Sequence, residues 1–338
     1  MRTIVSVQEI DEFEIRPHSE VSEWRRLVAS EIEALWKDRS SWVRVTCPCC
    51  SVDRARPAFA RLGVAYVECS SCGTVYAPER PDEATLRSWY RDSAAARFWR
   101  ERMLVRSRDI RYEKLVLPRV RWVMDGIAEH VPHATRLLDV SSNGRSLVDA
   151  LVAEAPQLKA WVVGPAADLD AESQGRVSVE PTRVDGLASL GPVHLVTAID
   201  AFDRASDLPA LVRAALDALA PGGVLFATTP VASGFEIQSL WDRSPGVLPP
   251  DRLNLPTVNG LLQMFAGSPW QVLELSTPGM FDVEIVRRAI ADSPDSTWPR
   301  VLRALVESAD SEDRRRLTEY LQSRRLASFA RLVVRRVN

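Results

Sequence analysis

Residues 192–230 read PVHLVTAIDAFDRASDLPALVRAALDALAPGGVLFATTP, and this stretch decides the fold class. Its first part, residues 192–200, is an apolar run with the length of a buried strand. Residues 208–220 repeat apolar side chains at helical spacing, a Pro-Gly-Gly turn closes that helix, and a second apolar run follows at residues 223–230. A strand, a helix and a strand in this order predict a parallel β-α-β unit.

The same alternation extends in both directions along the chain. Two more apolar runs, at residues 135–140 and 158–164, flank a helical pattern at residues 146–155. Beyond residue 291 the sequence predicts two helical stretches and then a closing strand in SFARLVVRRV, residues 328–337. Strands that alternate with helices of this length are typical of a doubly wound, largely parallel α/β sheet.

Such a sheet predicts where a ligand binds. In open α/β sheets, ligands bind outside the carboxyl ends of the strands, where the strand order reverses. The residues that directly follow the predicted strands should therefore surround one crevice. We expect these to be residues 139–145, 164–167, 185–186 and 199–202.

Two Cys-x-x-Cys turns, CPCC at residues 47–50 and CSSC at residues 69–72, predict a metal site in a small ribbon at about residues 41–80. Four thiolates from two such turns converge on one tetrahedral ion, and the small residue Gly73 suits a tight turn around it. Cys49 is the fifth cysteine, and we interpret it as a non-ligand. Disulfides or a redox dithiol are the alternatives that the spacing leaves open. We expect structural zinc bound by Cys47, Cys50, Cys69 and Cys72.

The start of the sequence and its charge bear on location and partners. MRTIVSVQEIDEFEIRPHSE has acidic residues early and lacks the apolar segment of a secretory signal. We therefore expect a cytoplasmic protein, in which thiols stay reduced and bind metal. A net charge of −2 gives no overall attraction for nucleic acid. We expect a small-molecule substrate, no membrane and no nucleic acid, and the sequence leaves room for a protein partner.

Two segments between these regions are predicted to be helical. Residues 20–37 place apolar side chains near one face, and residues 97–121 do so at roughly helical spacing. The second segment carries nine Lys or Arg against three acidic residues. We interpret it as a helix with a solvated basic face rather than as a phosphate or nucleic-acid site. Pro118 should kink or end this helix.

Several segments together carry a resemblance to a known family. They are CPCC…CSSCGTVYA, WYRDSAAARFW (89–99), RLLDVSSNGRSLVDAL (136–151), AIDAFDRASDLPALVRAALDALAPGGVLFATTP (198–230), PPDRLNLPTVNGLLQMF (249–265), STPGMFDVEIVRRA (276–289) and LQSRRLASFARLVVRR (321–336). In this order they resemble class I S-adenosylmethionine-dependent methyltransferases with an N-terminal zinc ribbon, including C-methyltransferases of deoxysugars. The resemblance implies a Rossmann-like methyltransferase sheet with helical insertions.

The resemblance also implies a cofactor, a reaction and a set of cofactor contacts. It implies methyl transfer from S-adenosylmethionine to a sugar, a sugar nucleotide or another small metabolite. The cofactor-binding residues that it implies are Asp139, Ser141, Asn143, Gly144, Gly164, Asp168, Asp185, Ala198 and Asp200. The chain should then divide into a helical extension (1–40), the zinc ribbon (41–80), a helical connector or lid (81–135), the methyltransferase domain (136–290) and C-terminal helices with the closing strand (291–338).

The cofactor turn departs from the family pattern. The family turn after the first strand often resembles Gly-Ser-Asn-Asp-Gly, whereas residues 141–145 read SSNGR. Arg145 stands at a position where glycine is usual, so we expect it to fill the methionine end of the pocket and to repel the sulfonium charge. Ala166 stands where the family has the acid that holds the ribose hydroxyls, and Asp168 is the nearest carboxylate.

The residues expected for proton transfer depart as well. The family's Glu-His after the fourth strand is Asp203-Arg204 here, and a later family histidine is Arg252, which does not accept a proton in a protein. The catalytic candidates that remain are Tyr90, Asp203 and Asp251. The four histidines, interpreted as surface or structural residues, are His18, His130, His133 and His194.

These departures leave two functions open. The first is an active S-adenosylmethionine-dependent methyltransferase. The alternative is a catalytically impaired methyltransferase-like protein that serves as a binding or scaffold subunit.

Overall fold

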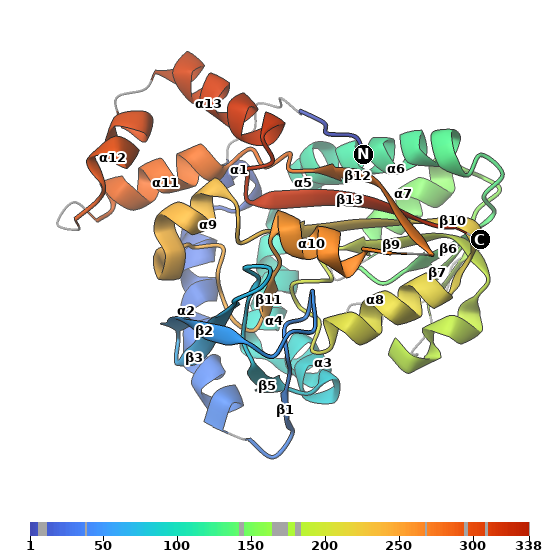
Figure 1. Cartoon of the computed structure of the whole chain (residues 1–338), viewed down its shortest axis with the longest axis horizontal. Helices are drawn as coiled ribbons and strands as arrows, with labels where there is room; N and C mark the ends of the chain where they lie inside the picture. The colour runs from blue at the N-terminus through green and yellow to red at the C-terminus, as the bar shows by residue number, and fades with distance from the viewer. Residues whose placement is uncertain are drawn as a thin grey trace.

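The computed structural model describes most of the chain. The described residues are 1–5, 12–37, 39–141, 145–163, 175–179, 184–267, 269–293, 297–307 and 310–337. Their largest feature is a seven-stranded sheet with helices on both faces (Figure 1). No helix within these residues is long and apolar enough to cross a membrane.

The sheet has the order β12-β13-β10-β9-β6-β7-β8. Its parallel strands are β6 (Arg136–Asp139), β7 (Lys159–Val162), β8 (Val177–Val179), β9 (Val193–Ile199) and β10 (Leu219–Pro230). The closing strand β13 (Phe329–Arg336) runs antiparallel to both β10 and β12 (Trp270–Ser276). The predicted doubly wound, Rossmann-like sheet is confirmed, as is the closing strand. The sequence interpretation did not include β8 or β12.

Alternation along the strands divides the core between the two faces of the sheet. Leu138 and Val196 belong to one cluster of buried side chains, together with apolar residues of α8 (Leu208–Asp217), α10 (Val258–Met264) and the 3-10 helix η4 (Val184–Leu190). Their strand neighbours Leu137 and Leu195 belong to a second cluster, with α6 (Leu117–His130) and α7 (Ser146–Glu154). Successive side chains point to opposite faces, so each strand contributes to both clusters.

A series of short helices precedes α6 in the chain and lies over one end of the sheet. They are α3 (Glu83–Asp92), α4 (Ala94–Phe98), the π-helix η1 (Trp99–Leu104), α5 (Arg108–Arg111) and the π-helix η2 (Tyr112–Val116). We call residues 83–119 the roof. The N-terminal helices α1 (Glu12–Ile15) and α2 (His18–Lys37) contact it, and α2 includes the helix predicted at residues 20–37.

The helix type changes next to Pro118. The π-helix η2 ends at Val116, and α6 begins at Leu117, whose N–H donates to the Tyr112 carbonyl. Pro118 then lies in the first turn of α6. At that position the missing N–H has no obligatory intrahelical acceptor, so proline is tolerated.

The cysteine-bearing region forms two small sheets. One pairs β1 (Trp42–Arg44) with β5 (Glu79–Pro81), and the other has the order β11-β4-β3-β2. Its strands are β2 (Ala55–Arg61), β3 (Val64–Cys69), β4 (Val75–Tyr76) and β11 (Asn254–Leu255). Strand β11 comes from the part of the chain between β10 and α10, so the ribbon borrows its last strand from the α/β region (Figure 1).

Five further helices complete the described part of the structure. They are α9 (Phe235–Leu240), the 3-10 helix η5 (Trp241–Arg243), α11 (Asp282–Ala291), α12 (Arg300–Val306) and α13 (Ser311–Ser323). Helices α11, α12 and α13 lie apart from the ribbon (Figure 1), whereas η5, which follows α9, contacts β2. Helices α12 and α13 are the two stretches predicted beyond residue 291. They share a buried cluster with α9 and α11 that includes Leu240, Val286 and Leu302.

Candidate functional site

A cavity of about 1180 Å³ lies at the carboxyl ends of the central strands. Val140 and Ser141 follow β6, Val163 follows β7, and Ile199 and Ala201 stand at the end of β9, and all five line the cavity. This is the edge of the sheet at which the strand order predicts a ligand.

The roof closes the cavity from the opposite side. One face of its helical segment lines the cavity at positions spaced three or four residues apart: Leu104, Val105, Arg108, Arg111, Tyr112, Leu115, Val116 and Arg119. Trp24 of α2 and Trp99 also line it, with their ring centroids 4.9 Å apart. The basic segment is therefore only partly solvated, because Arg111 and Arg119 face the cavity rather than bulk water.

The structure places some of the cofactor candidates at this edge and leaves others outside its description. Ser141 lines the cavity, whereas Asp139, Ala198 and Asp200 lie at the same strand ends without lining it. Asn143, Gly144, Gly164 and Asp168, and the side chain of Asp185, lie outside the described residues.

Asp139 connects the ends of β6 and β9 behind the cavity through hydrogen bonds. Its Oδ1 accepts hydrogen bonds from the hydroxyls of Ser141 and Thr197, both at 2.5 Å. The Ser141 hydroxyl also accepts the Ile199 N–H at 2.9 Å, so it links β6 to β9. Asp139 Oδ2 is buried with no hydrogen-bond partner, and burial raises the pKa of this carboxyl to about 6.

Asp200 lies directly after β9 with a strained backbone. Its φ of 53° is in the left-handed region, which non-glycine residues adopt at a cost and mainly at functional sites. The carboxylate pairs with Arg119 at 3.1 Å and accepts the Thr228 hydroxyl at 2.9 Å. Although burial opposes ionisation, the neighbouring arginines hold its pKa below the usual value, so Asp200 is an anion beside the cavity.

Arg145 does not fill the cavity, contrary to expectation. Its guanidinium bonds to Asp149 one turn along α7, with Nη2 2.8 Å from Oδ1, and it is not among the lining residues. A carboxylate at the i+4 position offers the side chain an intrahelical partner. Arg145 therefore places a positive charge beside residues 141–145, but its side chain does not block the cavity.

The three catalytic candidates lie close together in space. Tyr90 and Asp251 line the cavity, and Arg204 lies between them, 3.2 Å from the Asp251 carboxylate and with its guanidinium carbon 5.8 Å from the Tyr90 ring centroid. Tyr90 donates to the Pro250 carbonyl at 3.2 Å. Burial raises the pKa of Tyr90 well above its usual value, so its hydroxyl stays protonated and does not act as a base at neutral pH.

Asp203 is fully buried one layer behind this group. One carboxylate oxygen pairs with Arg252, and the other is buried without a hydrogen-bond partner. Burial raises the pKa of Asp203 to about 7, and the Arg252 and Arg204 guanidiniums oppose that shift. Asp203 does not line the cavity, which leaves Asp251 as the candidate carboxylate that does.

The match to a family model shows which protein family this chain belongs to. A model described as a methyltransferase domain matches residues 94–275, which is more than half of the chain and includes the roof from Ala94 onward and most of the sheet. The chain belongs to this methyltransferase domain family. Fold and family make the protein an S-adenosylmethionine-dependent methyltransferase. No curated protein is similar enough to match the sequence.

Solved structures with a similar fold include other methyltransferases. The plantazolicin methyltransferase BpumL, in complex with S-adenosylhomocysteine (SAH), is 8% identical over 75% of this chain and 94% of its own, with a TM-score of 0.46. Coclaurine N-methyltransferase, bound to N-methylheliamine and SAH, is 12% identical over 64% and 72%, with a TM-score of 0.41. An O-methyltransferase from a Brevibacillus brevis multienzyme, in complex with SAH, is 11% identical over 67% and 79%, with a TM-score of 0.39. Similarities this low carry no argument about a substrate.

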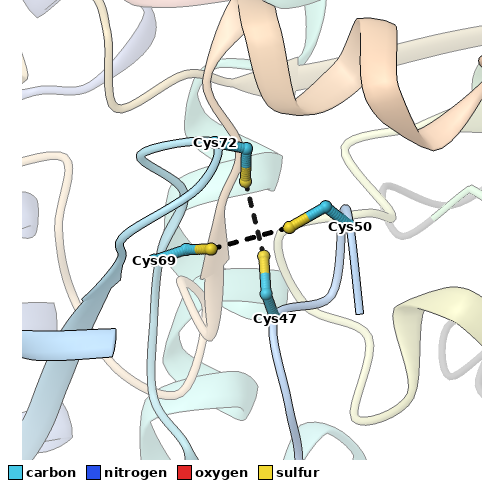
Figure 2. A group of neighbouring side chains, drawn as sticks. All are labelled: Cys47, Cys50, Cys69 and Cys72. Carbon is cyan, nitrogen blue, oxygen red and sulfur yellow. Dashed lines mark hydrogen bonds between the residues drawn. The ribbon is translucent and has the colours of Figure 1, made fainter. Parts of the chain in front are cut away.

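The cysteine cluster lies apart from the cavity of this methyltransferase domain, in the ribbon. The sulfurs of Cys47, Cys50, Cys69 and Cys72 all lie within 4.8 Å of one another and point toward a common centre (Figure 2). Cys47 and Cys72 are 3.5 Å apart, and Cys50 and Cys69 are 3.6 Å apart. A tetrahedral ion with zinc–sulfur distances of ~2.3 Å places its sulfurs about 3.8 Å apart, so the four thiols fit zinc.

Two turns with positive φ aim these thiols. Ser51 follows Cys50 with a φ of 59°, and Gly73 follows Cys72 with a φ of 74°. Gly73 was expected from the sequence, whereas Ser51 was not, because serine carries no comparable signal. Cys49 lies outside the four-thiol group, and burial raises the pKa of its thiol, which favours the neutral form.

Contacts fix the ribbon to the loop that carries Asp251. Thr257, which caps α10, donates to the Cys72 carbonyl at 2.6 Å and accepts the Gly260 N–H at 2.8 Å. A Cβ on Gly260 would lie 2.5 Å from Thr74 Oγ1, so only glycine permits this approach. Tyr66 of β3 donates to the Arg252 carbonyl at 2.8 Å. The loop at residues 250–257 is therefore packed directly against the metal ribbon.

Arg80 joins the ribbon to the α/β region. It is fully buried on β5, its acceptors among the described residues are uncharged, and burial lowers its pKa to about 10. Those acceptors are the carbonyls of Ala77, Ala205, Ser206 and Leu253 and the side-chain amide oxygen of Asn254. The Asn254 amide in turn donates to the Phe202 and Ala205 carbonyls, both at 2.8 Å. The ribbon thus holds the segment after β9 together with β11.

Sequence reasoning missed the cationic side of the cavity. Arg111, Arg119 and Arg204 all line it, and none was a candidate. The signal was present: Arg111, Leu115 and Arg119 recur every four residues, as one helical face requires. It was obscured because the same segment also carries exposed basic residues such as Arg102 and Arg106.

Proposed function

We propose that this protein transfers the methyl group of S-adenosylmethionine to a sugar, a sugar nucleotide or another small metabolite. The observation that carries the proposal is the cavity at the carboxyl edge of a methyltransferase-domain sheet. Its volume of about 1180 Å³ exceeds the ~300–1,000 Å³ of ordinary small-molecule pockets, so it has room for a cofactor and an acceptor together.

The cofactor would lie over the ends of β6 and β7. Ser141, Val163 and Leu187 line that part of the cavity. Bound S-adenosylmethionine supplies an electrophilic methyl group on a charged sulfur. The role of the chain is to orient the acceptor atom in line with that methyl and to exclude water, and the aromatic and aliphatic wall of the roof suits both tasks.

We assign proton removal from the acceptor to Asp251. Its carboxylate lines the cavity, and Arg204 holds it in place through an ion pair at 3.2 Å. Tyr90 keeps its proton, and Asp203 lies behind the wall, so neither competes for this role. Positioned general bases contribute about 10²–10⁴-fold to a rate.

The proposed zinc is structural. Cys47, Cys50, Cys69 and Cys72 would occupy all four positions of a tetrahedral ion, leaving none open for a substrate. In this role the metal stabilises the ribbon, and the ribbon holds the loop that carries Asp251. A cytoplasmic location, where thiols stay reduced, agrees with such a site.

The non-catalytic alternative rests on departures in sequence at residues 141–145, at Ala166 and at Arg252. Membership of the family favours an enzyme, and the pairing of Arg145 with Asp149 removes one of the objections. The alternative therefore rests on the remaining sequence departures alone.

The experiment measures binding and transfer separately. Calorimetry with SAH on the purified chain should show one site, and methyl transfer to a panel of sugars, sugar nucleotides and small metabolites should follow. Asp251→Asn should retain SAH affinity and reduce the transfer rate by about 10²-fold or more. Absence of SAH binding would refute the cofactor assignment, and an unchanged rate in Asp251→Asn would refute the role of Asp251.

A further inference from the structure

Three arginines of the cavity wall, Arg111, Arg119 and Arg204, act on one another electrostatically, and two of them form ion pairs with acids. Arg119 pairs with Asp200, and Arg204 pairs with Asp251. Among the described residues, no carboxylate lies within ion-pair distance of Arg111. Its contacts are a 3.3 Å hydrogen bond to the Ile15 carbonyl and the ring of Trp99, whose centroid is 5.8 Å from the guanidinium carbon.

The surroundings of Arg111 do not compensate its charge. Burial lowers the pKa of Arg111 to about 10, and the nearby guanidiniums of Arg16, Arg119 and Arg204 lower it further, opposed by Asp200 alone. The other acids that line the cavity are exposed or half-buried and form no ion pair with it: Glu83, Glu101, Asp207 and Asp217. Removing an unpaired charge from water is costly, and a bound anion would offset that cost at the half-buried Arg111.

Arg111 lies on the acceptor side of the cavity rather than on the cofactor side. Its neighbour Arg119 stacks over Phe329, the first residue of β13, at 5.9 Å. Asp200, which pairs with Arg119, accepts a hydrogen bond from Thr228 of β10. This group thus lies over β9, β10 and β13, whereas the proposed cofactor position lies over β6 and β7.

We propose that the methyl acceptor carries an anionic group, a phosphate or a carboxylate, which Arg111 binds at the roof of the cavity. The inference rests on the proposed function for calling the ligand an acceptor, but the anion site itself is independent of it. Trp24 and Trp99 stand beside this guanidinium, so the part of the acceptor next to its anionic group meets a flat apolar wall. A planar guanidinium binds either anion through two parallel hydrogen bonds.

The test uses two simple anions, inorganic pyrophosphate and benzoate, titrated into the full-length protein at constant ionic strength with chloride as the reference. Four proteins are compared: wild type, Arg111→Gln, Arg111→Lys and the matched control Arg102→Gln. Arg102 is an exposed arginine of the same roof that does not line the cavity. Thermal melting measures anion binding, and calorimetry with SAH runs in parallel on each protein.

We expect at least one of the two anions to stabilise wild type and Arg102→Gln equally. Losing a charged hydrogen bond worth about 1.5–3 kcal/mol should weaken its binding ten- to hundredfold in Arg111→Gln. Arg111→Lys should bind with intermediate affinity, because lysine keeps the positive charge but cannot form the two parallel hydrogen bonds of a guanidinium. Without ligand, Arg111→Gln should melt no lower than wild type, since it removes an uncompensated buried charge. The anion that binds identifies the acceptor as phosphorylated or carboxylated.

Two results would overturn the inference: neither anion binds wild type, or Arg111→Gln binds it as well as Arg102→Gln does. The SAH arm separates this failure from failure of the proposed function. If SAH binds all four proteins and neither anion binds, the anion site is wrong and the methyltransferase assignment stands. If an anion binds through Arg111 and SAH binds none of them, the cofactor assignment is wrong and the anion site stands.

Discussion

The cysteine ribbon and the cavity at the strand ends, the crevice predicted from the sequence, are built in opposite ways. The ribbon takes its four thiols from two turns of four residues each, and each turn has its own positive-φ residue, Ser51 or Gly73. The crevice takes its lining from several strand ends and from the roof. The geometry of the first is local, whereas that of the second depends on the packing of distant segments.

This difference explains how far each site could be derived. The four converging thiols could be predicted from the sequence, because the spacing within and between two short turns indicates which cysteines come together. For a crevice built from strand ends, the sequence predicts only the location. The order of strands predicts its position, and the side chains that reach into it depend on helices whose packing the sequence does not specify.

The largest expected effect comes from removing one thiol of the ribbon. Cys69→Ser should lose the bound metal and unfold the ribbon, because metal binding supplies folding energy to so small a unit. Metal analysis of the purified protein and circular dichroism measure the outcome. Cys49→Ser is the matched control and should keep one zinc per chain, since Cys49 lies outside the four-thiol group. Zinc retained at full stoichiometry in Cys69→Ser would contradict the ligand set.

A second effect is the pH dependence of stability that arises from Asp139, behind the cavity. The pKa of Asp139 is raised from 3.8 to about 6, so its protonated form favours the folded state. Its contribution is fully present below pH 3.8, declines as the pH rises toward 6, and is lost above that. Asp139→Asn keeps an oxygen for Ser141 and Thr197 but does not ionise, so its stability relative to wild type should rise across this window. Urea unfolding at pH 4 and pH 7 measures it, and an equal difference at both pH values would refute it.

A smaller effect tests the junction between the two regions. Thr257→Val removes the cap of α10 and the bond to the Cys72 carbonyl, and should lower the free energy of unfolding by about 1–2 kcal/mol. It should also speed the release of zinc to a chelator. Thr277→Val is the control, because the buried Thr277 hydroxyl has no hydrogen-bond partner among the described residues. Equal zinc release from both variants would show that the junction does not stabilise the metal site.

The smallest effect concerns the cofactor turn. Since Arg145 pairs with Asp149 and does not line the cavity, Arg145→Gly should change SAH affinity by less than about threefold, the scale of one surface ion pair. Calorimetry measures this. A tenfold or greater gain in affinity would mean that Arg145 obstructs the cofactor after all and would restore the interpretation drawn from the sequence.

Much of the sheet could be predicted because its buried strands are continuous apolar runs. Strand β12, WQVLELS, was missed because its alternation of apolar and polar residues is interrupted by the adjacent apolar residues Val272 and Leu273, where the structure has a register shift. Strand β11 has two residues, too few for any periodicity, and exists only because β4 is there to pair with it. The role of Arg80 could not be predicted either, because its hydrogen-bond acceptors are backbone carbonyls and one side-chain amide that only the folded structure brings together.

The borrowed strand β11 has a consequence for protein synthesis. A ribosome makes Cys47 through Cys72 well before it makes residues 254–255 and the α10 cap at Thr257. The nascent chain therefore presents its four thiols on a sheet that still lacks its last strand and its covering helix. A zinc ion bound at that stage would be held by the two turns alone. Pairing of β11 with β4 and packing of α10 would then cover the cluster and slow the loss of the metal, before the closing strand β13 has been made.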